Sequence, residues 1–156
     1  MHKVLKVTGL ALATLFMLGG SVQAADMSKQ VKARQAVMVL RGYYMGQLAA
    51  MAKGKMAYDA KLASSAANSM VALATSVDGS TMYPQGSGTD KLGDATRSRP
   101  EIWSTYPKVA EAGKAHVMAA QNMAQVAGNG LAALQGAIGG LGKTCGGCHK
   151  PFRVKK

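Results

Sequence analysis

Residues 145–149 read Cys145-Gly146-Gly147-Cys148-His149 and contain both cysteines of a chain of 156 residues. If this stretch is helical, cysteines three positions apart face the same side of the helix, and a histidine follows the second one directly. This spacing is typical of the site at which a c-type haem is attached through two thioether bonds. The other uses of two cysteines are a redox-active dithiol, a zinc site and a structural disulfide.

The N-terminal stretch indicates export. Residues 1–6 are short and basic, residues 7–18 are apolar, and residues 19–24 are small and polar. This pattern predicts a secretory signal peptide cleaved after Ala24; the alternative is an uncleaved anchor. The apolar run is too short to span a bilayer, and no later stretch approaches the ~20 apolar residues of a spanning helix. We therefore expect a signal peptide over 1–24 and one mature domain over 25–156 in the periplasm, without an integral membrane segment.

Export and the rest of the sequence favour haem attachment over the other three uses. A thioredoxin-like dithiol would need a strand before the motif, which the residues do not indicate. A structural zinc site needs four protein ligands, and His116 is the only other histidine of the mature chain. A disulfide leaves the adjacent histidine unexplained. We predict one haem c, bound through Cys145 and Cys148, with the neutral imidazole of His149 as an axial ligand. A packed or surface position is expected for His116.

Helical periodicity predicts an all-α fold. Apolar residues at steps of three and four indicate helices over 28–53 and 59–76, the first closed by Lys53-Gly54-Lys55 and the second capped by Asp59. Residues 77–105 read as a long loop. A third helix, capped by Ser104 or Thr105, is expected to about residue 128, and a fourth from about residue 131 towards Cys145. Four such helices form an antiparallel bundle. The apolar face expected for the first helix comprises Val37, Leu40, Tyr44, Leu48 and Met51.

The composition indicates a thin protein core and a basic surface. Hydrophobic residues make up 48% of the chain but aromatic residues only 5%, so a large apolar cofactor would supply missing bulk. The net charge is +12; without Lys3 and Lys6 of the leader, 17 basic residues face 7 acidic ones, which gives +10. The basic residues lack the aromatic interleaving of a nucleic-acid site, so we expect a redox partner with an acidic docking surface; the alternative is an anionic membrane surface. The acidic residues are scattered singly, which disfavours a hydrolytic enzyme.

Four segments resemble the class II c-type cytochromes, the cytochrome c′ family of four-helix bundles. The resemblance covers essentially the whole mature chain and places the haem motif close to the C-terminal end, as in that family. It implies a haem between the helices with His149 on its proximal side. The segments are Arg34–Met38, Lys53–Ala60, Arg99–Trp103 and Cys145–Arg153.

The resemblance also implies roles for three further side chains. Arg34 falls where the family has an arginine that contacts a haem propionate; the alternative is a solvated arginine. Arg153 matches a family arginine on the proximal side, against the alternative of a solvated charge. Trp103 would pack near the haem edge, with ordinary core packing as its alternative.

Met38 lies one turn after Arg34, at the position that faces the distal side of the iron in the family. Members with a non-ligating residue there have a five-coordinate, high-spin iron that only small ligands such as nitric oxide reach. A methionine thioether would instead complete His/Met ligation, which suits electron transfer, or would merely fill the pocket.

From Met38 we predict a low-spin electron carrier that is not an enzyme. The alternative is a five-coordinate cytochrome c′ that binds nitric oxide or another small gas, and peroxidase-like turnover is a third, weaker interpretation. Either a monomer or a homodimer is expected, because family members often dimerise through their first two helices.

Overall fold

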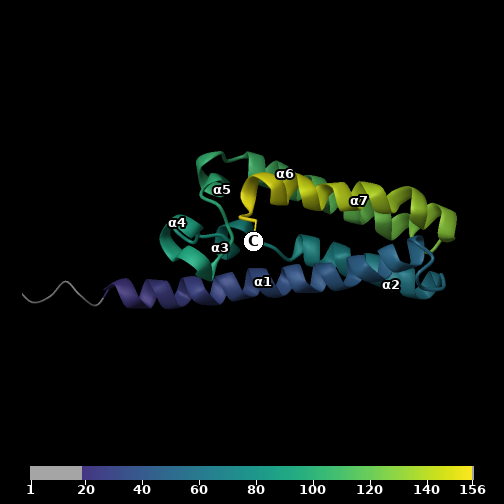
Figure 1. The fold of residues 1–156 in the computed structure, drawn as a ribbon, viewed down its shortest axis with the longest axis horizontal. Coiled ribbons are helices and arrows are strands. Elements are labelled where there is room, and N and C mark those ends of the chain that lie inside the picture. The colour runs from purple at the N-terminus through teal and green to yellow at the C-terminus, as the bar shows by residue number, and fades with distance from the viewer. Residues whose placement is uncertain (1–18, 156) are drawn as a thin grey trace, which may run out of the picture.

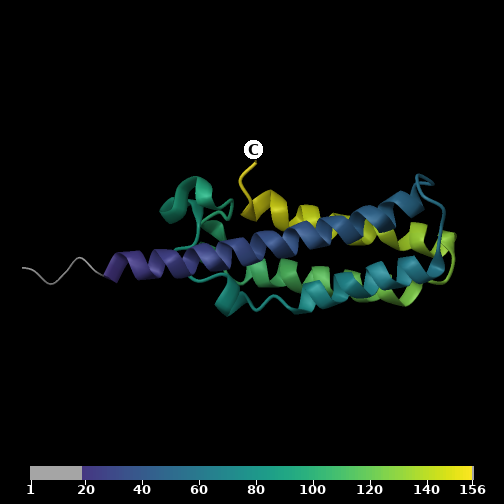
Figure 2. The same cartoon turned by 90° about the horizontal axis from the view of Figure 1, so that it is seen from below.

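The computed structural model describes residues 19–155, in which four long helices form a bundle (Figure 1). They are α1 (Gly19–Ala52), α2 (Ala60–Thr75), α6 (Lys108–Val126) and α7 (Leu131–Phe152). Both α1 and α6 pack against α2 and α7, so the helices form a ring of four antiparallel neighbours (Figure 2). The predicted all-α antiparallel four-helix bundle is confirmed. None of the described helices combines the length and apolar character needed to cross a bilayer.

The predicted signal peptide lies mostly outside the described residues and stays a prediction. Helix α1 begins at Gly19, earlier than the expected start near Ser28, so the predicted cleavage point after Ala24 falls within its first turns. The N-terminal part of α1 projects beyond the other three long helices (Figure 1). The bundle itself is built from residues that follow the predicted cleavage point.

Two tight turns close one end of the bundle, which we call the far end: residues 53–59 between α1 and α2, and residues 127–130 between α6 and α7. Gly54 has a φ of 68°, which favours glycine, and it ends α1 as predicted. The Asp59 carboxylate accepts a hydrogen bond from the Leu62 backbone N–H at 2.7 Å, which confirms the predicted cap. The Tyr58 hydroxyl joins the two turns, since it donates to the Ala127 carbonyl at 2.8 Å and accepts from the Gly130 N–H at 2.9 Å.

The protein core lies towards this far end and is made of small and flexible side chains. No aromatic ring belongs to its fully buried set, as the composition predicted. The helices approach closely through alanine, and methionine fills the irregular spaces between them. The buried cluster comprises Leu48, Met51, Ala63, Ala66, Ala67, Met70, Ala74, Ala120, Met123, Ala127, Leu134 and Leu141.

The predicted inner face of α1 is wrong at Leu40, which is 45% exposed. The inward row of α1 instead contains Arg34, Met38 and Arg41 before it reaches the core at Leu48. The search for apolar periodicity did not detect this row because two of its members are arginines. The polar row lies towards the opposite end of the bundle, which we call the attachment end.

The segment between α2 and α6 crosses the attachment end and contains short helices (Figure 1). These are α3 (Gly79–Met82), α4 (Thr89–Leu92), the 3₁₀ turn η1 (Gly93–Ala95) and α5 (Glu101–Ser104). The expected loop is therefore partly helical. The predicted cap of α6 at Ser104 or Thr105 is also wrong, because the Thr105 hydroxyl donates back to the Glu101 carbonyl at 2.7 Å and closes α5. Helix α6 then begins at Lys108.

Candidate functional site

The motif Cys145–His149 lies on the last turns of α7, which continues through its glycines to Phe152. Both thiols are free and half-buried, one helical turn apart. The Cys145 thiol points back along the helix, with its sulfur 3.8 Å from the Leu141 carbonyl. The predicted helical placement of the motif is therefore what the structure shows, and the two sulfurs share one side of α7.

The protonation states of this turn fit haem attachment better than dithiol chemistry. Burial raises the pKa of the Cys148 thiol, whereas a redox-active dithiol needs a lowered thiol pKa. Burial, followed by the charges of Arg153, Arg97 and Arg41, lowers the pKa of His149. A neutral imidazole with a free lone pair is the form that binds a metal. Among the described residues, no three His, Cys, Asp or Glu side chains gather closely enough for a metal site of their own, which disfavours zinc.

A stretch of the bundle beside this turn lacks a protein core. Helix α7 has no fully buried apolar side chain between Leu141 and Phe152, an interval of about 16 Å along the helix. Helix α1 has none between Val31 and Leu48. The intervening inward positions carry half-buried residues, the motif on α7 and Met38 and Arg41 on α1. This interval fits a large, flat apolar group held by the two cysteines.

Two buried nitrogen atoms near this interval have no hydrogen-bond partner among the described residues: Arg41 Nε and His116 Nε2. The Arg41 guanidinium donates to the Leu73 carbonyl at 2.7 Å and lies within electrostatic reach of both cysteines. Sequence reasoning missed Arg41, although its position seven residues after Arg34 places both on one helical face. Buried polar groups without partners are expected where a bound group completes the site.

His116 is buried, with 8% of its surface exposed, so its predicted packed position is confirmed. Its Nδ1 lies 2.9 Å from the Thr144 hydroxyl, which itself donates to the Leu141 carbonyl at 2.7 Å. With the Thr144 hydroxyl donating to Leu141, we assign the tautomer in which Nδ1 donates to that hydroxyl oxygen and Nε2 carries a lone pair. Burial, assisted by the charges of Arg41 and His149, lowers the pKa of His116 to about 4.

Arg34 is also buried, so the alternative of a solvated arginine is wrong. Its guanidinium donates to the Met82 carbonyl at 3.0 Å and to the Ser87 hydroxyl and carbonyl at 2.7 and 3.2 Å. The plane lies 4.6 Å from the centre of the Tyr83 ring, a cation–π contact. Arg34 therefore ties the connecting segment to α1, and the contact with a propionate that the resemblance implies stays a prediction.

Trp103 and Arg153 lie at the same end of the bundle. The half-buried Trp103 indole donates to the Tyr83 carbonyl at 3.0 Å, and its ring lies so close to Gly88 that a Cβ there would clash. It thus packs within the connecting segment, and its predicted place at the haem edge is untested. The Arg153 side chain is exposed, yet its charge contributes to the lowered pKa of His149, so it lies on the side of α7 that carries the motif.

The residues after the motif are paired with the connecting segment. Arg153 and Ser98 form an antiparallel β-bridge, with hydrogen bonds from the Arg99 N–H to the Phe152 carbonyl at 3.0 Å and from the Val154 N–H to the Arg97 carbonyl at 2.9 Å. The Arg97 guanidinium donates twice more to the Val154 carbonyl, at 2.6 and 3.0 Å. The attachment turn is therefore fixed at its C-terminal side.

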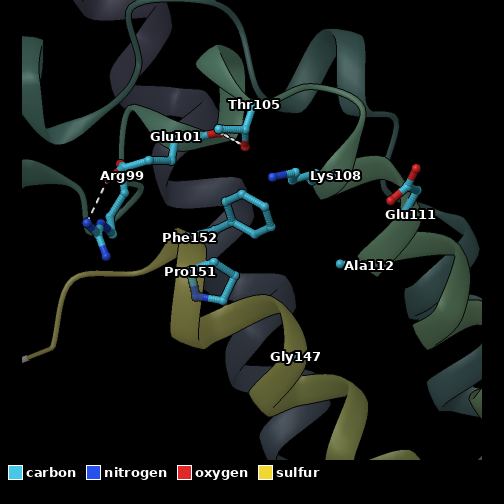
Figure 3. Close-up of a pocket in the computed structure, with 9 residues that line it drawn as sticks. All are labelled: Arg99, Glu101, Thr105, Lys108, Glu111, Ala112, Gly147, Pro151 and Phe152. Carbon is cyan, nitrogen blue, oxygen red and sulfur yellow. Dashed lines mark hydrogen bonds and ion pairs between the residues drawn. The ribbon is translucent and has the colours of Figure 1, made fainter.

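Behind the attachment turn lies a cavity of about 560 Å³, between α5, the start of α6 and the end of α7 (Figure 3). The Phe152 ring points into it, and the Lys108 side chain extends towards that ring. The two glutamates of the chain, Glu101 and Glu111, also line it, whereas neither cysteine does. Its two glutamates distinguish it from the interval between α1 and α7, which neither of them lines.

Comparison with known proteins shows which family has this arrangement. The family model described as Cytochrome C′ matches residues 29–153, from α1 to the end of the motif helix. The chain belongs to the cytochrome c′ family. Cytochrome c′ of Cereibacter sphaeroides is 38% identical over 146 residues, which cover 93% of this chain and 97% of the relative.

Two solved cytochromes c′ share the fold closely. A cytochrome c′ from Rhodobacter sphaeroides superimposes with a TM-score of 0.79 at 35% identity, covering 83% of this chain and 98% of the other. Another, described as showing an unusual ligand-controlled dimer dissociation, gives a TM-score of 0.75 at 31% identity, covering 83% and 97%. As a member of the cytochrome c′ family, the protein carries one covalent haem c, for which Cys145 and Cys148 are its only cysteines.

Proposed function

We propose that this cytochrome c′ binds a small gas ligand, such as nitric oxide, at the iron of its haem, which His149 would hold. The match to cytochrome c′ over residues 29–153 supports this most, because cytochromes c′ are typically five-coordinate and high-spin. The ligand control described for a relative at 31% identity adds support. The proposed role is binding rather than enzymatic turnover, in the periplasm.

The residues of the site have distinct parts in this proposal. The haem would supply an iron with one open coordination position. The neutral imidazole of His149 would hold the iron, because its lowered pKa keeps its lone pair free. Arg34 holds the connecting segment against α1 through its hydrogen bonds to Ser87. The flexible, apolar Met38 would leave room for an uncharged diatomic ligand and disfavour charged ones.

The second candidate is the electron carrier, with Met38 as the sixth ligand. The observation that favours it is the position of Met38, half-buried on the inward row of α1 between Arg34 and Arg41. Arg41 on this row lies within electrostatic reach of both cysteines, which supports a row that faces the attachment turn. A thioether there would raise the potential and produce a low-spin iron.

The spectrum of the purified ferric protein separates the two functions. Gas binding predicts a high-spin spectrum, rapid uptake of nitric oxide by the ferrous protein, and no change of spin state in Met38→Leu. Electron transfer through His/Met ligation predicts a low-spin spectrum with a weak far-red band, converted to high spin by Met38→Leu. Met45→Leu is the matched control, because Met45 lies two turns after Met38 on α1 and packs against the core.

A homodimer is the oligomeric state we propose. Helix α1 exposes a group of apolar side chains on its outer face, including Val39 (71% exposed) and Tyr43 (60% exposed). Exposed apolar surface of this kind favours an interface between two copies. Sedimentation with and without nitric oxide tests this state, and a monomer under both conditions would contradict it.

A further inference from the structure

Four basic side chains surround the end of the attachment helix; we call Arg97, Lys150, Arg153 and Lys155 the basic patch. The last three are exposed, and Arg97 is half-buried. The pairing of residues 97–99 with 152–154 brings Arg97 beside the other three, although it is far from them in sequence. The patch therefore belongs to a fixed part of the fold.

None of these four side chains forms an ion pair within 4.0 Å in the part of the chain that the structure describes. The nearby Glu101 is paired with Arg99 at 2.7 Å, which is the one ion pair within 4.0 Å among the described residues. No aspartate or glutamate follows Glu111 in the sequence. A group of like charges without counterions creates a positive potential that reaches about one Debye length, roughly 8–10 Å at physiological salt.

The patch lies directly beside the haem-attachment turn. Lys150 follows His149, and Arg153 comes one turn later. The charges of Arg153 and Arg97 act on His149 itself, so the patch lies within electrostatic reach of the residue predicted to hold the iron. A cation at the C-terminus of a helix interacts favourably with the helix dipole. This interaction accounts for the position of Lys150 in the last turn of α7, but not for Arg97 or Lys155, which lie outside the helix.

We propose that the basic patch is the surface on which this protein receives an acidic redox protein, and on which it exchanges electrons with anionic reagents. The inference requires the attached haem but not a particular sixth ligand, so it holds for both functions proposed above. Because the patch surrounds the attachment turn, an anionic partner is drawn to the part of the surface nearest the redox centre.

The test uses the reduced haem-loaded protein and two oxidants of opposite charge. One electron leaves the protein and reduces either hexacyanoferrate(III) to hexacyanoferrate(II) or tris(phenanthroline)cobalt(III) to the cobalt(II) complex. At low salt, Lys150→Glu/Arg153→Glu should slow electron transfer to the anionic oxidant by on the order of tenfold. The same variant should accelerate electron transfer to the cationic oxidant. Both differences should shrink as salt is added.

The matched control is Lys55→Glu/Lys61→Glu, which changes the net charge equally at the far end of the bundle (Figure 1). It should alter both rates less than twofold. A neutral pair, Lys150→Gln/Arg153→Gln, should give a smaller shift of the same sign and covers the case in which charge reversal disturbs folding. Equal effects of patch and control variants would show that only total charge matters and would overturn the proposal.

Two other outcomes would also overturn it. If the patch variant changes the electron-transfer rates to both oxidants in the same direction, the substitution has shifted the redox potential of the haem rather than the local electrostatic field. If it leaves both rates unchanged but abolishes cosedimentation with phosphatidylglycerol vesicles, the patch binds an anionic membrane instead. Opposite changes for the two oxidants, absent from the control, support the docking surface.

Discussion

At the far end of the bundle the buried side chains are alanine, leucine and methionine, whereas at the attachment end they include Arg34, Ser87, Thr96 and His116. The far end is closed by short turns and close helix contacts, and its core needs nothing beyond the chain. The attachment end holds its connecting segment through hydrogen bonds, and within the described residues it leaves Arg41 Nε and His116 Nε2 without partners. Burial of such groups is costly unless something pairs with them or fills the space beside them.

The two ends of the bundle are therefore stabilised in different ways, the far end by helix packing and the attachment end by a bound group. Helices with small side chains can pack closely without help, and this suffices where α1, α2, α6 and α7 meet at the turns. Where the helices carry the motif and the inward arginines, the same small side chains leave an interval without a core. The stability of that end should therefore depend on the haem.

The largest expected effect comes from removing the attachment. In Cys145→Ser/Cys148→Ser, purified without haem, we expect the free energy of unfolding to fall by about 5 kcal/mol or more, which is most of the stability of a typical domain. Hydrogen exchange should show loss of protection first around α3–α5 and the end of α7. A variant that melts as cooperatively as the wild type would contradict the dependence on haem.

A smaller effect is expected from damage to the far end alone. Leu134 is fully buried, so Leu134→Ala should cost about 3 kcal/mol through lost burial and a residual cavity. The haem spectrum should not change. Leu131→Ala, at a leucine 38% exposed on the same helix, is the matched control and should stay within about 0.5 kcal/mol of the wild type. Urea unfolding of the two variants measures the difference, and an altered spectrum in the first would show that the ends are coupled.

The smallest effect is a dependence on pH at the boundary between the two ends. The folded-state pKa of His116 is lowered to about 4, below its ordinary value of 6.5, so the folded protein disfavours the protonated form. The stability that His116 contributes is complete above pH 6.5 and is lost as the pH falls towards 4. Between pH 7 and 4.5 the loss should be about 2 kcal/mol.

His116→Gln tests this dependence, because glutamine keeps a donor for the Thr144 hydroxyl but does not titrate. Its free energy of unfolding, measured in urea, should change less between pH 7 and 4.5 than that of the wild type. Equal slopes would assign the acid sensitivity to other groups. The groups whose charges act on His116 are Arg41 and His149.

The parts of the structure that could be predicted from the sequence are those set by neighbouring residues. Asp59 caps α2 through a backbone N–H three residues away, and Gly54 ends α1 through its own φ. The spacing within the motif likewise determines that both cysteines lie on one side of α7. Each of these depends on local geometry, which a single stretch of sequence contains.

The parts that could not be predicted depend on contacts between distant residues. Arg34 reaches Met82 and Ser87 across 48 and 53 residues, and His116 reaches Thr144 across 28. Nothing near Arg34 in the sequence specifies these partners. The inward row of α1, which the apolar pattern missed, has the same cause, since its arginines find their acceptors in distant residues: Arg34 in the connecting segment and Arg41 at Leu73 of α2.

The pairing of residues 97–99 with 152–154 has a consequence for the order in which the chain can fold. During synthesis the N-terminus of the chain emerges first, so this pairing cannot form until the helix that carries both cysteines has also been made. The turns of the far end, in contrast, join residues that are close in sequence and can close early. The pairing that fixes the attachment turn is therefore among the last long-range contacts that the chain can form.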